Sequence, residues 1–179
     1  MRIIAETDRL FLREIDIADE KSFFLLDSDP EVHTFLGSKP VETAKEARMM
    51  IESIKRQYVE KGIGRWAVVE KATGNFVGWS GLKLITEMVN TRIDYYELGY
   101  RFLKKYWGRG YATEAAEASL CYAFQILKLK QIFAIADINN LASRSVLEKV
   151  EFEIVETFFY QYHEHHWFEI DKEKWSKKG

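Results

Sequence analysis

Apolar and polar positions along the chain recur with periods typical of both strands and helices. Residues 9–13 alternate polar and apolar side chains, as a half-buried strand does. Acidic residues then precede the apolar run 23–26, which predicts a helix with an acidic first turn. Ser28-Asp29-Pro30 should end that helix, and we expect a short second helical piece over 31–36.

The stretch 42–60 predicts an amphipathic helix, because apolar residues recur on one face at Ala47, Met50, Ile51, Ile54 and Tyr58. Three strands should follow. Residues 66–69 and 76–85 flank a hairpin turn at 71–74, and 93–103 forms the third strand.

The second half of the chain predicts helices and strands in alternation. We expect a helix over 111–127, a strand over 132–138, a helix over 140–150, and a closing hairpin of strands 152–160 and 163–170. The run 132–138 is apolar without alternation, which indicates a strand buried on both faces. The pattern therefore belongs to the mixed α/β (α+β) class.

Composition mainly excludes function classes. A chain of 179 residues without a linker-like tract predicts a single domain over 1–179. Its formal net charge of −2 leaves no broad basic field for nucleic acid, and no apolar run is long enough for a bilayer. Residues 1–8 lack a signal peptide's apolar region, and the lone Cys121 cannot form an internal disulfide. We therefore expect a cytoplasmic protein without nucleic-acid or membrane partners.

Candidate chemistry begins at the glycine loop that precedes the helix at 111. Gly108 and Gly110 remove side chains where the backbone turns, and Ala112 keeps the first helical turn small. Free N–H groups at a helix N-terminus then point at one spot, which attracts an anion such as a pyrophosphate. The alternative is an ordinary tight turn that exposes Arg109.

This loop resembles the acyl-CoA-binding loop of the GNAT (GCN5-related) N-acetyltransferase superfamily. It reads Tyr-Trp-Gly-Arg-Gly-Tyr-Ala-Thr-Glu-Ala over 106–115. Four further segments resemble, in the same order, the ribosomal-protein N-acetyltransferase (RimJ/RimL-like) branch: 7–13 (Thr-Asp-Arg-Leu-Phe-Leu-Arg), 29–32 (Asp-Pro-Glu-Val), 97–100 (Glu-Leu-Gly-Tyr) and 140–149 (Asn-Leu-Ala-Ser-Arg-Ser-Val-Leu-Glu-Lys). The resemblance implies the GNAT fold, a mixed, mostly antiparallel sheet of about seven strands flanked by about four helices.

The resemblance also implies acetyl-CoA as the acetyl donor and direct transfer in a ternary complex. Main-chain N–H groups of the loop would hold the pyrophosphate, with a charge-assisted contact from Arg109. Trp107 departs from the superfamily's loop pattern, which has Gln or Arg there. The residues expected to bind acetyl-CoA are Tyr100, Phe102, Leu103, Gly108, Arg109, Gly110, Tyr111, Ala112, Thr113, Asn140, Ser143 and Lys149.

Acetyl transfer to an amine requires a proton acceptor, donors for the oxyanion, and stabilisation of the departing thiolate. Glu97 is the candidate base, directly or through a water, because its aromatic neighbours would exclude solvent. The alternative is a structural salt bridge from Glu97 to Arg13, Arg92 or Lys83 on an adjacent strand. Gly99 either permits a close approach or is a simple packing glycine.

The superfamily's usual general acid is a tyrosine on the late helix, and that position here holds Leu147. Ser143 is the candidate proton donor to the sulfur, with a water or Tyr122 as alternatives. Glu151 stands where relatives carry glycine after the late helix. Because a Glu adopts positive φ less readily than Gly, we expect the helix end to be reshaped or strained.

The branch resemblance favours a protein N-terminal amine as acceptor. His33, Phe35, Trp66 and Trp79 are expected to line the acceptor cleft, although ordinary core or surface roles would also account for them. One rival is an acetyltransferase for a small amine, such as a polyamine, amino acid or aminoglycoside. Another is a non-catalytic acyl-CoA-binding sensor or scaffold. The chain is expected to be a monomer or a homodimer.

Two histidines near the C-terminus raise the question of a metal site. His163 and His165 would share one face of a strand. No second ligand cluster accompanies them in the sequence, so we expect no metal.

Overall fold

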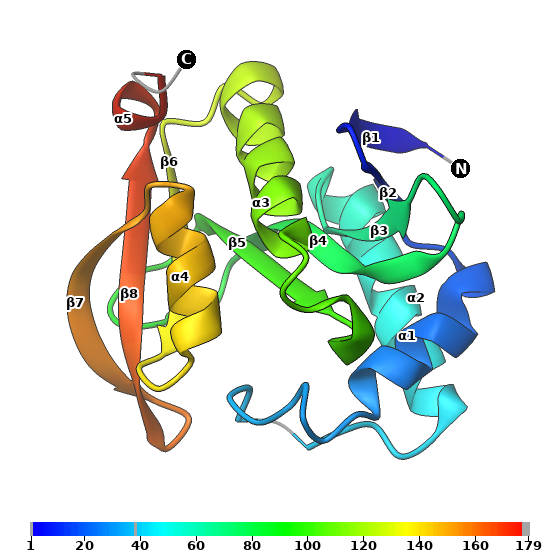
Figure 1. Ribbon diagram of the computed structural model, residues 1–179. Coiled ribbons are helices and arrows are strands. Elements are labelled where there is room, and N and C mark those ends of the chain that lie inside the picture. The colour runs from blue at the N-terminus through cyan, green and yellow to red at the C-terminus, as the bar shows by residue number, and fades with distance from the viewer. Residues whose placement is uncertain (1, 38, 177–179) are drawn as a thin grey trace.

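The computed structural model describes residues 2–37 and 39–176 and places eight strands in one sheet (Figure 1). The order across the sheet is β1 (Ile3–Glu6), β2 (Leu10–Glu14), β3 (Arg65–Glu70), β4 (Phe76–Ile85), β5 (Tyr95–Phe102), β6 (Gln131–Asp137), β8 (His163–Asp171) and β7 (Glu153–Tyr160). Neighbouring strands are antiparallel except β5 and β6, which run parallel. The mixed, mostly antiparallel sheet predicted from the sequence is confirmed, with β1 as an additional edge strand.

Helices cover both faces of this sheet (Figure 1). The helices are α1 (Glu20–Asp27), α2 (Ala44–Lys61), α3 (Tyr111–Cys121), α4 (Leu141–Lys149) and the short α5 (Lys172–Ser176). Ala67 packs in the cluster beneath α1 and α2, whereas its neighbours Trp66 and Val68 pack in the main core with α3 and α4. Every residue of β3 is buried, because this strand is covered on both faces.

Two predicted helical segments differ in the structure. Residues 31–36 form a series of turns and no helix. Asp29 accepts from the Glu31 N–H at 2.9 Å and Thr34 donates to the Glu31 carbonyl at 2.9 Å. Such local side-chain bonds compete with helical ones. The predicted helix 111–127 is α-helical to Cys121 and continues as a π-helical turn over Tyr122–Ile126.

The end of α4 has a non-glycine residue with positive φ, as the sequence predicted. Glu151 has φ +68°. Its N–H donates to the Glu148 carbonyl at 3.0 Å, and the Phe152 N–H donates to the Leu147 carbonyl at 3.0 Å. These two bonds close the helix in the manner of a Schellman motif, in which glycine is the preferred residue. The strained helix end is confirmed.

We therefore expect Glu151→Gly to raise the free energy of unfolding by about 1 kcal/mol, because glycine reaches positive φ without a Cβ penalty. Urea denaturation measures the change. Glu151→Ala is the matched control, since it removes the same carboxylate and retains the Cβ. An equal gain in both variants would attribute the effect to the charge and contradict the backbone explanation.

Candidate functional site

A cavity of about 800 Å³ opens where β5 and β6 separate. These two strands pair at Glu97 opposite Phe133. Beyond this point, residues 98–102 and 134–137 line opposite walls of the cavity. The volume lies in the range of small-molecule sites, about 300–1,000 Å³. The separation of the strands therefore creates the space that a ligand needs.

The glycine loop lies at one end of the cavity, and its backbone has the conformation that requires glycine. Gly108 and Gly110 have φ values of +71° and +78°, and both line the cavity with Tyr111, Ala112 and Thr113. No side chain of the described residues caps the N-terminus of α3. The first-turn N–H groups of α3 therefore remain available for an anion.

The loop is fixed in place by Arg9. Its Nε donates to Glu114 Oε2 at 2.7 Å, and its Nη1 donates to the Arg109 carbonyl at 2.9 Å. Burial by itself would raise the pKa of Glu114, but hydrogen bonds from Thr7 and Arg9 lower that pKa below its ordinary value. Arg9 thus holds Glu114 ionised and connects the loop to the segment before β2.

Trp107 and Arg109 differ in how they meet the cavity. Trp107 lines it and donates from its indole Nε1 to the Phe102 carbonyl at 2.8 Å, which ties the loop to the end of β5. The Arg109 guanidinium lies 5.3 Å from the centre of the Tyr106 ring, outside the cavity lining. A phosphate contact from Arg109 stays a prediction. Leu103 needs correction: its N–H donates to the Val77 carbonyl at 3.0 Å and is not available to a ligand.

Glu97 lies in the cavity wall and forms a salt bridge with Arg65, a partner that the sequence analysis did not consider. Arg65 Nη2 is 2.7 Å from Glu97 Oε1. Arg65 Nη1 donates to the carbonyls of Gly81 at 2.7 Å and of Glu97 at 2.5 Å. Burial lowers the pKa of Arg65, and the Glu97 carboxylate opposes this shift. The salt bridge therefore fixes the position of the carboxylate.

The partners expected for Glu97 pair elsewhere: Arg13 with Asp19, Arg92 with Glu156 and Lys83 with Glu87. Gly99 is explained by the same salt bridge. A Cβ on Gly99 would lie 2.6 Å from Arg65 Nη2, far inside van der Waals contact. Of the two roles considered for this glycine, the structure shows a close approach, and the approaching group is the guanidinium.

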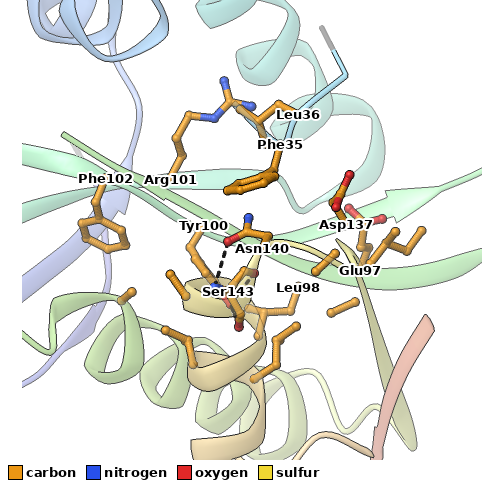
Figure 2. A pocket seen from close by; sticks show the side chains of 18 of the residues that line it. Phe35, Leu36, Glu97, Leu98, Tyr100, Arg101, Phe102, Asp137, Asn140 and Ser143 are labelled. Carbon is orange, nitrogen blue, oxygen red and sulfur yellow. Dashed lines mark hydrogen bonds between the residues drawn. The ribbon is translucent and has the colours of Figure 1, made fainter. Parts of the chain in front are cut away.

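The N-terminus of α4 supplies a further part of the cavity lining (Figure 2). Asn140 Oδ1 accepts from the Ser143 N–H at 3.1 Å and caps the helix. The Tyr100 hydroxyl lies 3.0 Å from both Ser143 Oγ and the Ser143 carbonyl oxygen. Burial raises the pKa of Tyr100 above its ordinary value, so its hydroxyl keeps its hydrogen. The structure thus brings together Tyr100, Asn140 and Ser143, all expected to bind acetyl-CoA; the hydroxyl contact of Tyr100 was not foreseen.

Two of the four residues expected in the acceptor cleft line the cavity, and two do not. Phe35 and Trp79 line it, and Phe35 projects toward Asn140 in Figure 2. Trp66 is 1% exposed in the core, with its ring 5.1 Å from that of Tyr122. His33 is buried beside Asp27, with Nε2 3.8 Å from Oδ1. The expected placement of Trp66 and His33 is corrected, because both face the interior.

The sequence analysis missed Asp137 as a carboxylate of the cavity lining. Asp137 ends β6 and lines the cavity. Its Oδ1 accepts from the Asn139 N–H at 2.8 Å. An acidic residue at the end of an otherwise apolar strand was the available signal. The cavity lining thus contains the carboxylates of Glu97 and Asp137 together with the cations Arg65, Lys83 and Arg101.

Lys149 and Leu147 of α4 also line the cavity. Within residues 2–37 and 39–176 there is no group of three His, Cys, Asp or Glu side chains placed to hold a metal ion. Over the same residues, none of the helices has the length and apolar character needed to span a membrane.

Known proteins share both the sequence pattern and the fold. The family model described as "Acetyltransferase (GNAT) domain" matches residues 9–153. The uncharacterized N-acetyltransferase YoaA of Bacillus subtilis is 30% identical over 161 residues, which cover 88% of this chain and 89% of YoaA. A GNAT-family acetyltransferase structure from Bacillus anthracis has a TM-score of 0.79 at 26% identity, over 97% of this chain and 99% of that one.

Two further solved structures share the fold at lower identity. Spermidine N-acetyltransferase of Vibrio cholerae, in complex with CoA and spermine, has a TM-score of 0.76 at 18% identity and covers 95% of this chain and 99% of its own. A putative ribosomal-protein-serine acetyltransferase, also from Vibrio cholerae, has a TM-score of 0.73 at 22% identity and covers 93% and 96%.

Proposed function

The chain belongs to the GNAT acetyltransferase family, and we propose that it transfers an acetyl group from acetyl-CoA to a protein N-terminal amine by direct attack in a ternary complex. One observation carries this proposal: a single cavity joins an uncapped helix N-terminus at one end to the Glu97 carboxylate at the other. The first feature suits a pyrophosphate, and the second suits an amine.

The residues present fit acetyl-CoA. Free N–H groups at the start of α3 would bind its pyrophosphate, and the main chain of Tyr100 and Phe102 with the Asn140 amide would line the path of its pantetheine arm. Bound there, acetyl-CoA supplies a thioester carbonyl for attack by the amine. Arg109 is proposed to add a charge-assisted contact to the pyrophosphate, and Lys149 is the cation proposed for the 3′-phosphate.

Glu97 is proposed as the proton acceptor, directly or through a water. An N-terminal amine titrates near ~8, so at neutral pH most of it carries a proton that must leave before attack. Arg65 holds the Glu97 carboxylate in place, and Asp137 adds negative charge that attracts the ammonium form. Ser143 is proposed as the donor to the departing sulfur.

The choice of a protein N-terminus rests on the segments that resemble ribosomal-protein acetyltransferases. The solved spermidine acetyltransferase keeps a small polycationic amine as the second candidate. The lone Cys121 fits a reducing compartment, and a cytoplasmic location is part of the proposal.

Thiol release from acetyl-CoA tests the proposal with two acceptor sets in parallel. The first contains Ser- and Ala-initiated peptides, and the second contains polyamines and aminoglycosides. We expect faster release with the peptides. Faster release with the small amines would retain the mechanism and overturn the acceptor. Tight CoA binding without turnover on either set would favour a sensor or scaffold.

A further inference from the structure

The contact between Tyr100 and Ser143 concerns the step in which the sulfur of CoA leaves the acetyl group. Ser143 lines the cavity on α4, and Tyr100 reaches it from β5, forty-three positions away in the sequence. The usual tyrosine position of α4 holds Leu147, which is 1% exposed and carries no polar group. Leu147 therefore cannot stabilise the leaving group, and Ser143 is the polar group proposed for this role.

Serine by itself is a poor source of a proton for this step. A thiol titrates near ~8.5, and an aliphatic alcohol is a far weaker acid, so full transfer from Ser143 to a thiolate is strongly uphill. A hydrogen bond from the Ser143 hydroxyl to the thiolate requires no such transfer. Hydrogen bonds to a charged atom are about twice as strong as neutral ones.

We propose that Tyr100 is a positioning residue, which donates to Ser143 Oγ and thereby directs the Ser143 hydrogen toward the sulfur, so that CoA departs as a thiolate. In that step the amine nitrogen forms the C–N bond while the C–S bond breaks. The electron pair leaves on the sulfur. The proton that the nitrogen loses on forming the amide passes to Glu97, directly or through a water, after Glu97 has released the earlier ammonium proton to solvent. This inference rests on the proposed use of acetyl-CoA.

The geometry lets the hydrogen bond from Tyr100 to Ser143 Oγ form as negative charge develops on the sulfur. The Tyr100 hydroxyl is 3.0 Å from both the carbonyl oxygen and Oγ of Ser143, so rotation of its O–H bond changes the acceptor without moving a heavy atom. An interaction that strengthens only as the sulfur becomes negative lowers the barrier without tightening ground-state binding. Burial raises the pKa of Tyr100, which keeps this phenol a donor throughout.

The position of Ser143 in its helix adds to the effect. It is the third residue of α4, a helix of nine residues capped by Asn140. The positive end of the helix dipole therefore faces the same part of the cavity and favours negative charge there. Tyr100, Ser143 and the start of α4 form one unit for an anionic leaving group.

The test is the titration of the thiol of CoA bound to the protein, followed by thiolate absorbance in the ultraviolet. In the parent protein, we expect the pKa of bound CoA to lie about 1 unit below that of free CoA, and Tyr100→Phe to remove about half of the shift. Ser143→Ala should remove most of it. In the Ser143→Ala background, Tyr100→Phe should have no further effect, because Tyr100 acts through that hydroxyl.

Tyr96→Phe is the matched control, since it makes the same change on the same face of β5 outside the cavity lining. It should leave the thiol titration unchanged. With a peptide acceptor, Tyr100→Phe should lower kcat about 10-fold with an unchanged KM for acetyl-CoA.

Two results would overturn the inference alone: equal thiol pKa values in the parent and Tyr100→Phe, or an effect of Tyr100→Phe that persists in Ser143→Ala. The second result would assign Tyr100 a structural role through the Ser143 carbonyl. Failure of the parent to bind CoA at all would instead overturn the proposed function, and this inference with it.

Discussion

Replacing Glu97 with glutamine is expected to lower turnover by about 100-fold or more at pH 6.5 to 7, the usual effect of losing a general base. Glutamine keeps an oxygen that can accept from Arg65 Nη2, so the cavity wall retains its shape. It cannot accept the amine proton. Affinity for acetyl-CoA should change little, because Glu97 lies early in β5 and the glycine loop follows the end of that strand.

The dependence on pH distinguishes this role from a structural one. As pH rises through the pKa of the acceptor amine, ~8 for an N-terminus, the amine loses its proton to water and needs the base less. The deficit of Glu97→Gln should therefore shrink between pH 7 and 9. Glu169→Gln, a half-buried change outside the cavity, is the control. Unchanged turnover in Glu97→Gln, or an equal deficit at every pH, would exclude Glu97 as the base.

The order of strands and helices could be predicted because most elements carry a clear period. The exceptions have physical causes. β1 is only four residues long and pairs on one side, so Ile3–Glu6 is too short to show alternation. Residues 31–36 contain helix-compatible side chains, but Asp29 accepts from a backbone N–H and Thr34 donates to a backbone carbonyl, and these bonds stabilise turns.

The candidate site was predictable where the backbone provides it and less so where distant side chains meet. Gly108 and Gly110 are recognisable locally, since glycine is the residue that most readily takes the positive φ found at both positions. The sequence does not distinguish Trp66 from Trp79, since both lie in apolar strands. Trp66 belongs to β3, which is buried on both faces, and it does not line the cavity, whereas Trp79 does. Alternation cannot separate the two faces of such a strand.

Arg65 is a clearer example of a side chain whose placement the local sequence does not predict. A charged residue at the start of an apolar strand usually lies at the surface. Here it is 9% exposed, because the carboxylate and carbonyl of Glu97, two strands away on β5, and the Gly81 carbonyl on neighbouring β4 accept its hydrogen bonds. Only the register of β3, β4 and β5 reveals that pairing. The contact of Tyr100 with Ser143 likewise depends on how α4 packs over β5.

A single methyl group added at Gly99 is expected to disrupt both stability and turnover, because it would strike the Arg65 side chain. In Gly99→Ala, the new Cβ would lie 2.6 Å from Arg65 Nη2 and 2.8 Å from Arg65 Cζ. The guanidinium is nearly buried and bonded to three acceptors, so it can move only by breaking the salt bridge with Glu97. We expect the free energy of unfolding to fall by roughly 3 kcal/mol and turnover to fall about 100-fold, as for Glu97→Gln.

A double-mutant cycle of Gly99→Ala with Arg65→Ala identifies the cause of the two losses. Urea denaturation measures stability, and turnover is measured for each protein of the cycle. Arg65→Ala removes the side chain that the methyl group would strike. In that background, Gly99→Ala should cost less than about 1 kcal/mol, since alanine suits an extended strand and contacts at neighbouring sites are not additive. Turnover should stay low in both Arg65→Ala proteins, because the carboxylate has lost its anchor in each. A similar stability cost of Gly99→Ala with and without Arg65 would contradict the steric explanation and place the role of Gly99 in the backbone itself.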